Sequence, residues 1–194
     1  AVVLVDSFKE LDFEKIVYPK LERLVSKGKD IISLTRIGSY HLKLLEDLCN
    51  SNNVSFQSFV DDKKPNMPQF TNILDIDVPV IFVLGLGDRT QKFNIQLSLW
   101  EGLKRLGYNV SQIGSKSYGS IFGFHSFPNF MLSDDISEQN KVILFNRMVK
   151  RIEINEQPDV IIIGVPGGIM AINKDIAQGF GIIPYMISQA VKAD

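Results

Sequence analysis

Short apolar runs alternate along the chain with longer segments in which apolar residues recur every three or four positions. Such runs are typical of buried parallel strands, whereas the longer spacing is typical of helices that bury one side. In the first third of the chain the runs lie at 2–5, 30–34 and 54–60, and helical patterns begin near Asp12 and Ser39. This order predicts a β-α-β-α-β unit with parallel strands.

The alternation resumes after a change of character. Residues 61–69 combine charges and two prolines without an apolar period, and a new apolar run begins at Val78. We predict further strands at 78–84, 109–113, 159–163 and 181–185, helices at 91–106 and 137–154, and a short helix between Gly168 and the last strand. The chain is therefore predicted to be an α/β protein with mainly parallel sheets and flanking helices. It comprises a Rossmann-like unit over 1–60, a linker over 61–76 and a second α/β domain over 77–194.

The segment 80–99 carries the most specific chemical pattern. An apolar run ends in Gly85 and Gly87, and Lys92 follows five residues later at the start of a helical pattern. Strand, glycine turn, lysine and helix in this order present backbone N–H groups and one ammonium to a phosphate. The second domain is therefore predicted to be P-loop-like and doubly wound. Its candidate nucleotide-binding residues are Gly85, Gly87, Asp88, Thr90, Gln91 and Lys92.

This loop departs from the consensus G-x-x-x-x-G-K-[ST]. Gln91 precedes Lys92, Phe93 follows it, and Leu86 stands where the first glycine belongs. A hydroxyl after the lysine normally binds Mg²⁺, and Phe93 has none. A dinucleotide-binding G-x-G-x-x-G is a poorer match because Thr90 replaces its third glycine. The pattern predicts a degenerate phosphate site.

A purely structural interpretation of the same loop stays open. In that interpretation Thr90 or Asp88 only caps the following helix, and Lys92 is solvated.

A second glycine turn follows the strand predicted at 159–163. Gly167 and Gly168 can form an anion-binding nest or a simple turn. In an active nucleotide hydrolase a carboxylate stands near the end of this strand to hold Mg²⁺. Gly164 and Val165 fill those places, and Asp159 lies at the opposite end. Hydrolysis is therefore the least supported activity.

Residues 115–130 form a predicted loop rich in glycine, serine and aromatic residues. We take Ser115 and His125 as candidates for a ligand- or partner-binding loop, because aromatic loops often form binding surfaces. In the alternative, the phenylalanines of this loop complete the core. His125 and His41 are the only histidines, so a histidine-based metal site is not expected.

Composition narrows the function classes. The 194 residues carry a formal net charge of −1, which gives no chain-wide electrostatic case for nucleic acid or an anionic membrane. The single cysteine, Cys49, excludes an intrachain disulfide and a cysteine-based metal cage, and suits a reducing cytoplasm. No apolar run reaches the ~20 residues of a membrane span. Strand-like residues at Ala1 and an uncapped end at Asp194 fit a fragment of a longer protein, truncated at its C-terminus, as well as a complete chain.

Four phrases carry a family resemblance: KFNIQLSL, GYNVSQIGS, FGFHSFPNF and PDVIIIGVPGG. Together they resemble bacterial accessory proteins of peptide-maturation systems, which are encoded beside precursor peptides and radical-SAM maturases. More distantly, the order of loop, lysine and strands resembles P-loop NTPases of the dethiobiotin-synthetase and cobyrinate-synthase kind. The first resemblance implies a role in natural-product biosynthesis, with a precursor peptide or its maturation enzyme as partner. The second implies ATP or GTP with Mg²⁺ on the loop at 85–92.

Three functions remain at this point. The first is an accessory protein of ribosomal-peptide maturation whose degenerate P-loop binds a nucleotide or phosphate. The second is a protein-interaction module without a ligand, and the third is an active NTP-dependent enzyme.

Overall fold

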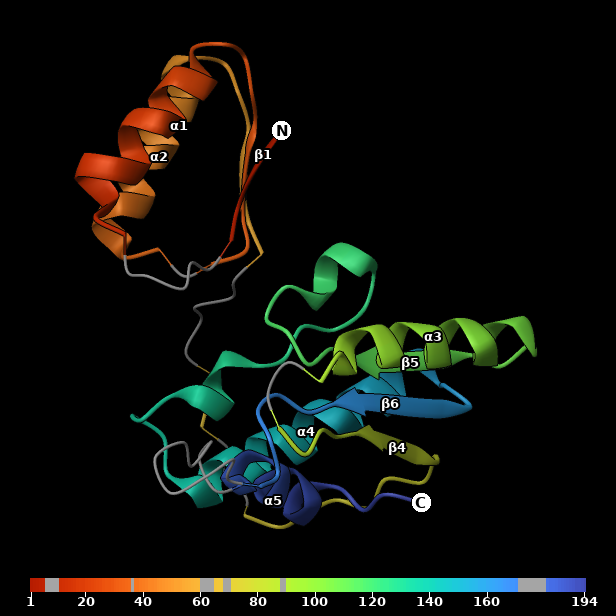
Figure 1. Cartoon of the computed structure of the whole chain (residues 1–194). Helices are drawn as coiled ribbons and strands as arrows, with labels where there is room; N and C mark the ends of the chain where they lie inside the picture. The colour runs from red at the N-terminus through yellow and green to blue at the C-terminus, as the bar shows by residue number, and fades with distance from the viewer. Residues whose placement is uncertain (6–10, 36, 60–64, 68–70, 88–89, 171–180) are drawn as a thin grey trace. The chain divides into compact units, whose positions relative to one another are not determined.

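A computed structural model describes residues 1–5, 11–35, 37–59, 65–67, 71–87, 90–170 and 181–194. The chain divides into two compact units, Ala1–Asp61 and Asp62–Asp194. Each unit has its own three-stranded parallel sheet and its own hydrophobic core (Figure 1).

The first unit has the strand order β1-β2-β3, with β1 at Val2–Leu4, β2 at Ile31–Ser33 and β3 at Phe56–Ser58. A π-helical turn, Phe13–Val17, leads into α1 (Tyr18–Val25), and α2 covers Ser39–Ser51. The two α-helices lie side by side on one face of this sheet (Figure 1). The Asp12 side chain caps the π-helical turn by accepting a hydrogen bond from the Lys15 N–H at 3.0 Å. Cys49 belongs to the core of this unit.

The second unit has the strand order β4-β6-β5, with β4 at Val80–Val83, β5 at Val110–Ile113 and β6 at Val160–Gly164. The central strand β6 is buried throughout. Ile161 and Ile163 point into the core shared with α4 (Glu138–Glu156) and α5 (Ile182–Ala190). The intervening positions face α3 (Lys92–Arg105), whose Gln96 lies against Gly164. Helices therefore cover both faces of the sheet.

Two short 3₁₀ helices, Gly119–Phe122 and Asn129–Leu132, interrupt the segment predicted as a loop at 115–130. Its phenylalanines divide between two environments. Phe124 and Phe127 are buried, whereas Phe122 is 46% exposed.

The strand predicted at 181–185 is wrong, because these residues begin the helix α5. The run of Ile182 and Ile183 is as apolar as a buried strand, and periodicity cannot separate the two over so few residues. Pro184 falls in the first helical turn, where a backbone N–H has no partner within the helix. The short helix expected between Gly168 and this segment lies largely outside the described residues.

Residues 72–78 are held against α4 by side chains of that helix. Asn146 bonds both the N–H and the carbonyl of Leu74, at 2.9 and 2.8 Å. One carboxylate oxygen of Glu153 accepts the N–H groups of Asp77 and Val78 at 2.5 and 3.1 Å. The segment that precedes β4 is thereby held in place by side chains of α4.

The predicted fold class is confirmed: the chain is an α/β protein with parallel sheets flanked by helices. Among the helices that the structure describes, none has the length and apolar character needed to cross a bilayer.

Candidate functional site

The loops that follow β4, β5 and β6 leave the same edge of the sheet, because all three strands are parallel. Val83 stands beside Gly164, and Ile113 beside Ile163. The loops after β4 and β6 are joined directly. The N–H groups of Ile169 and Met170 donate to the carbonyls of Gly85 and Leu86, at 3.1 and 3.2 Å. We call this region the carboxyl-edge corner, defined by residues 85–87, 90–92 and 164–168.

Lys92 occupies the centre of this corner. It is the first residue of α3 and is only 8% exposed. Its Nζ donates to the carbonyl oxygen of Gly167, and lies 3.4 Å from that of Gly87. The glycine turns after two neighbouring strands therefore converge on one ammonium group. The alternative in which Lys92 is solvated is wrong.

Thr90 does not cap α3, contrary to the purely structural interpretation of this loop. Thr90 Oγ1 donates to the Gly87 carbonyl at 3.3 Å and does not cap α3. The residue before the helix is Gln91, in the left-handed conformation at φ 56°, and no side chain caps the helix there. Asp88, the other cap candidate and a predicted binding residue, lies outside the described residues.

Gly85 is required by the packing of the loop. A Cβ at this position would overlap Thr90 Oγ1 and would stand 2.9 Å from Lys92 Cδ. The glycine thus lets the loop fold back onto the start of α3. This brings an ammonium and the first-turn N–H groups of a 14-residue helix to one place, an arrangement that favours an anion.

The end of β6 has no room for a metal-binding carboxylate. A Cβ at Gly164 would overlap Gln96 Oε1 and would stand 2.8 Å from the backbone nitrogen of Ser115. Gln96 is fully buried, and its Nε2 donates to the Ile113 carbonyl at 2.6 Å. The described residues of the corner therefore suit a phosphate better than a phosphate with a protein-bound Mg²⁺.

Three predicted site residues remain: two of them lie at the corner, and the third lies in a separate pocket. Gly168 is buried in the turn after β6. Ser115 is 5% exposed, and its N–H lies 3.3 Å from Gln96 Oε1, so it supports the corner from the loop after β5. His125 is not part of the corner.

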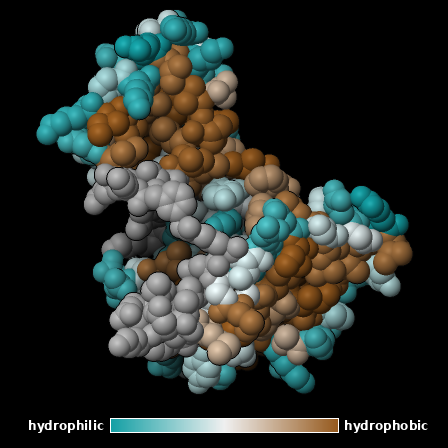
Figure 2. Space-filling view, in the orientation of Figure 1, coloured by the Kyte–Doolittle hydropathy of each residue, from teal (hydrophilic) through white to brown (hydrophobic). Residues whose placement is uncertain are grey.

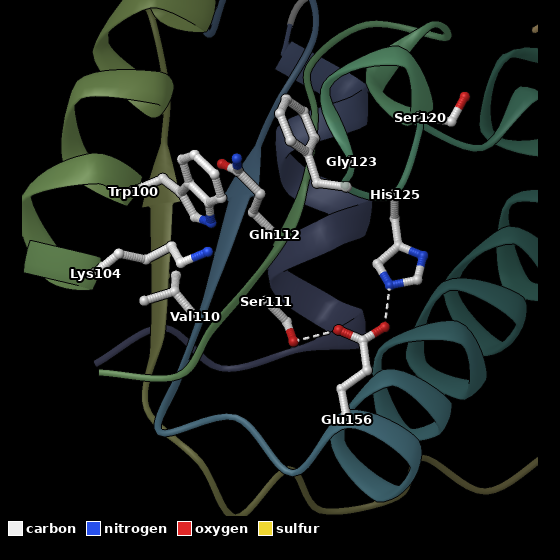
Figure 3. A pocket seen from close by; sticks show the side chains of 10 residues that line it. Trp100, Lys104, Val110, Ser111, Gln112, Ser120, Gly123, His125 and Glu156 are labelled. Atoms are coloured by element: carbon white, nitrogen blue, oxygen red, sulfur yellow. Dashed lines mark hydrogen bonds and ion pairs between the residues drawn. The ribbon is translucent and has the colours of Figure 1, made fainter. Parts of the chain in front are cut away.

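His125 belongs to a pocket beside the edge strand β5 (Figure 3). Its backbone pairs with β5, since its N–H donates to the Gln112 carbonyl at 3.0 Å and its carbonyl accepts the Gly114 N–H at 2.7 Å. Its Nε2 lies 2.5 Å from Glu156 Oε1, at the end of α4. The other carboxylate oxygen of Glu156 accepts the Ser111 hydroxyl at 2.5 Å.

This trio cannot work as a nucleophilic triad. Glu156 stands between Ser111 and His125, so the imidazole does not contact the hydroxyl that it would have to deprotonate. The carboxylate instead fixes the histidine and the loop that carries it.

The pocket has a volume of about 430 Å³, within the range of small-molecule sites. The sequence patterns single out only His125 among its lining residues. The others are Trp100, Lys104, Val110, Ser111, Gln112, Ser120, Gly123, Phe124 and Glu156. One available signal was the pair Ser111 and Gln112, two polar residues in a strand of a sheet covered on both faces.

Comparison with known proteins supports the fold alone. No protein-family model matches the sequence. No curated protein matches it either. Among solved structures, a DUF1611 family protein from Anabaena variabilis ATCC 29413 is similar, with a TM-score of 0.59 and 12% sequence identity. The match covers 89% of this chain and 48% of that protein, so the chain spans about half of its length.

Proposed function

We propose that the second unit binds the phosphate group of a nucleotide or another phosphorylated small molecule at the carboxyl-edge corner. The observation that carries this proposal is the position of Lys92. A buried ammonium at the start of α3 is held by carbonyls from the turns after both β4 and β6.

A phosphate competes well for this ammonium. Carbonyl oxygens are neutral acceptors, whereas phosphate oxygens carry a negative charge, which adds Coulomb attraction to the hydrogen bonds of the ammonium. The uncapped first turn of α3 supplies further N–H donors beside Lys92. A bound phosphate would therefore offer Lys92 a charged acceptor beside the carbonyls of Gly87 and Gly167, and would gain the helix amides as well.

Binding without hydrolysis is the form of this function that the residues support. Phe93 offers no hydroxyl after the lysine, and Gly164 is closed to a carboxylate by Gln96. ATP or GTP would thus act as a ligand that changes stability or partner affinity. Maturation of a ribosomal peptide is the setting that the sequence resemblance suggests, and it is part of this proposal on that ground alone.

The test is a thermal-unfolding titration with ATP, GTP and inorganic phosphate, each with and without Mg²⁺. A ligand that binds only the folded protein stabilises it by ~2.7 kcal/mol at a hundredfold excess over Kd. We expect a concentration-dependent rise in Tm for at least one of these ligands, with little dependence on Mg²⁺. Lys92→Met should abolish the rise, because it keeps the buried stem of the side chain and removes the ammonium.

Lys192→Ala is the matched control. Lys192 is exposed and follows α5, beside the start of β4 and hence at the opposite edge of the sheet. This variant should retain the full ligand-induced shift. The proposal fails if none of the ligands raises Tm in the parent protein, or if Lys92→Met responds as strongly as Lys192→Ala.

A second candidate function is docking of a protein or peptide at the same edge. Leu86 and Met170, joined through their backbones, are 66% and 58% exposed, and Phe122 stacks edge-on against Phe93 at 5.2 Å. Hydrophobic side chains also cover wide parts of the visible surface (Figure 2). Exposed apolar residues near one another favour an interaction site. Leu86→Ser should weaken capture of such a partner and leave a phosphate-induced Tm shift intact.

A further inference from the structure

The pocket beside β5 contains a buried amide without a partner. Gln112 is 1% exposed, and neither its Nε2 nor its Oε1 has a hydrogen-bond partner among the residues that the structure describes. Buried side-chain amides are nearly always hydrogen-bonded in native proteins. An unpaired donor and an unpaired acceptor on one planar group call for a ligand that offers the complementary pair.

The pocket also carries a positive charge that no carboxylate neutralises among the described residues. Lys104 Nζ lies 4.5 Å from the centre of the Trp100 ring, and no described ion pair involves it. The one carboxylate in the pocket, Glu156, is already bound by Ser111 and His125. Figure 3 shows Gln112, Trp100 and Lys104 on one side and His125 with Glu156 on the other.

We propose that this pocket binds a small planar anion that carries an amide-type donor–acceptor edge, such as an imide or lactam ring with a carboxylate. The planar edge pairs with the Gln112 amide, and the negative charge pairs with Lys104. The Ser111–Glu156–His125 contacts hold the loop at 119–125 over the site. Because the Gln112 amide is buried, a side chain of the pocket lining has to move when the ligand enters.

This site is separate from the carboxyl-edge corner. Trp100 and Lys104 lie 8 and 12 residues beyond Lys92 on α3, or roughly 12 and 18 Å along the helix axis. The inference therefore does not depend on phosphate binding at Lys92, and Lys92→Met should leave it unchanged.

Trp100 is the only tryptophan of the chain, so its fluorescence reports on this pocket directly. Three probes separate the contributions: orotate has both the imide edge and the carboxylate, uracil has only the edge, and benzoate has only the carboxylate. We expect saturable quenching by orotate. Uracil and benzoate should each bind at least about tenfold more weakly than orotate. Saturation-transfer-difference NMR of each probe provides a second measurement that does not rely on fluorescence.

Variants identify the contacts. Gln112→Met keeps the size of the side chain and should reduce orotate binding to the level of benzoate. Lys104→Met should reduce it to the level of uracil. Arg105→Met is the control for charge, since Arg105 is exposed on the same helix and paired with Glu101 at 3.0 Å. Urea unfolding of each variant shows whether the second unit remains folded.

Two results would overturn the proposal. One is the absence of saturable orotate binding up to about 10 mM, ten times the Kd of a millimolar ligand. The other is equal binding of orotate by the parent protein and by a folded Gln112→Met variant.

Discussion

The side-chain amide of Gln96 lies directly against the Cα of Gly164, where α3 meets the end of β6. Gln96 bonds the Ile113 carbonyl and the Ser115 N–H, so it also ties α3 to the end of β5. Gly164, which stands near the position expected for the metal-binding carboxylate of an NTP hydrolase, is used here for packing.

The Gln96–Gly164 contact predicts coupled mutational effects. Gly164→Ala should destabilise the second unit by about 1–3 kcal/mol, because the added methyl overlaps a buried side chain. In a Gln96→Ala background the same change should cost clearly less, which a double-mutant cycle followed by Trp100 fluorescence in urea would reveal. Gly102→Ala is the control: it lies in α3 with open space around it, and should stabilise by about 0.5–1 kcal/mol. Additive effects of Gly164→Ala and Gln96→Ala would contradict the contact.

The two units should unfold in separate steps, each with its own reporter. Cys49 is 1% exposed in the first unit, and burial raises the pKa of its thiol, so it should react with a thiol reagent only when that unit opens. Trp100 reports on the second unit. We expect Cys49 to become reactive at lower urea than the Trp100 transition, because the first core is much the smaller. Coincident transitions would show that the units unfold together.

Acid should act on the first unit through Asp30. Its Oδ1 accepts the Ser55 N–H at 2.8 Å, and hydrogen bonds from the Ser55 backbone and side chain hold the pKa of Asp30 below 3.8. A lowered pKa in the folded state contributes stability above pH 3.8 that is lost as the pH falls through the folded value. Asp30→Asn should therefore show a shallower loss of stability between about pH 5 and 2, measured by urea unfolding followed by circular dichroism. If the parent protein and Asp30→Asn lost stability equally as the pH falls, Asp30 would not have this role.

Glu153 should be a main support of the second unit. It is 8% exposed, accepts the N–H groups of Asp77 and Val78, and contacts Lys150. Glu153→Ala should cost about 2–4 kcal/mol in urea unfolding, since it leaves two N–H groups without their acceptor and removes one of the two carboxylates paired with Lys150. Glu138→Ala, an exposed change in the first turn of the same helix, should cost about 0.5 kcal/mol.

The contacts of Lys150 with Asp77 and Glu153 predict a loss of stability at high pH. Hydrogen bonds to Asp77 and Glu153 raise the pKa of Lys150 above 10.5. The associated stability is present below pH 10.5 and is lost as the pH rises through the raised value. Lys150→Met should remove this part of the alkaline loss in a pH series of unfolding curves. An unchanged alkaline limb in that variant would contradict the assignment.

The sequence pattern predicts most of the elements, because strands such as β4 and β6 are short apolar runs and helices such as α3 have a clear apolar side. The pattern fails at α5 because a helix that is apolar on most sides has no period to distinguish it from a strand. In the corner, the pattern identifies both Lys92 and Gly167 but not the contact between them, because they lie 75 positions apart. Contacts of this kind depend on which strands become neighbours, and strand order is not visible in local spacing.

The pocket beside β5 escaped prediction for the same reason. Glu156 looks like an ordinary charged residue at the end of a helix, and only the folded chain brings it to Ser111 and His125. Gln112 was detectable in principle, as a polar residue in a strand covered on both sides. That its side-chain amide has no hydrogen-bond partner among the described residues is visible only in the folded chain.

The backbone bonds from Ile169 and Met170 to Gly85 and Leu86 make the turns after β4 and β6 move as one piece. Whatever displaces one turn is transmitted to the other, and through Gly167 to Lys92 at the head of α3. A displacement of either turn would thus change the exposed surface of both, since Leu86 and Met170 are 66% and 58% exposed there.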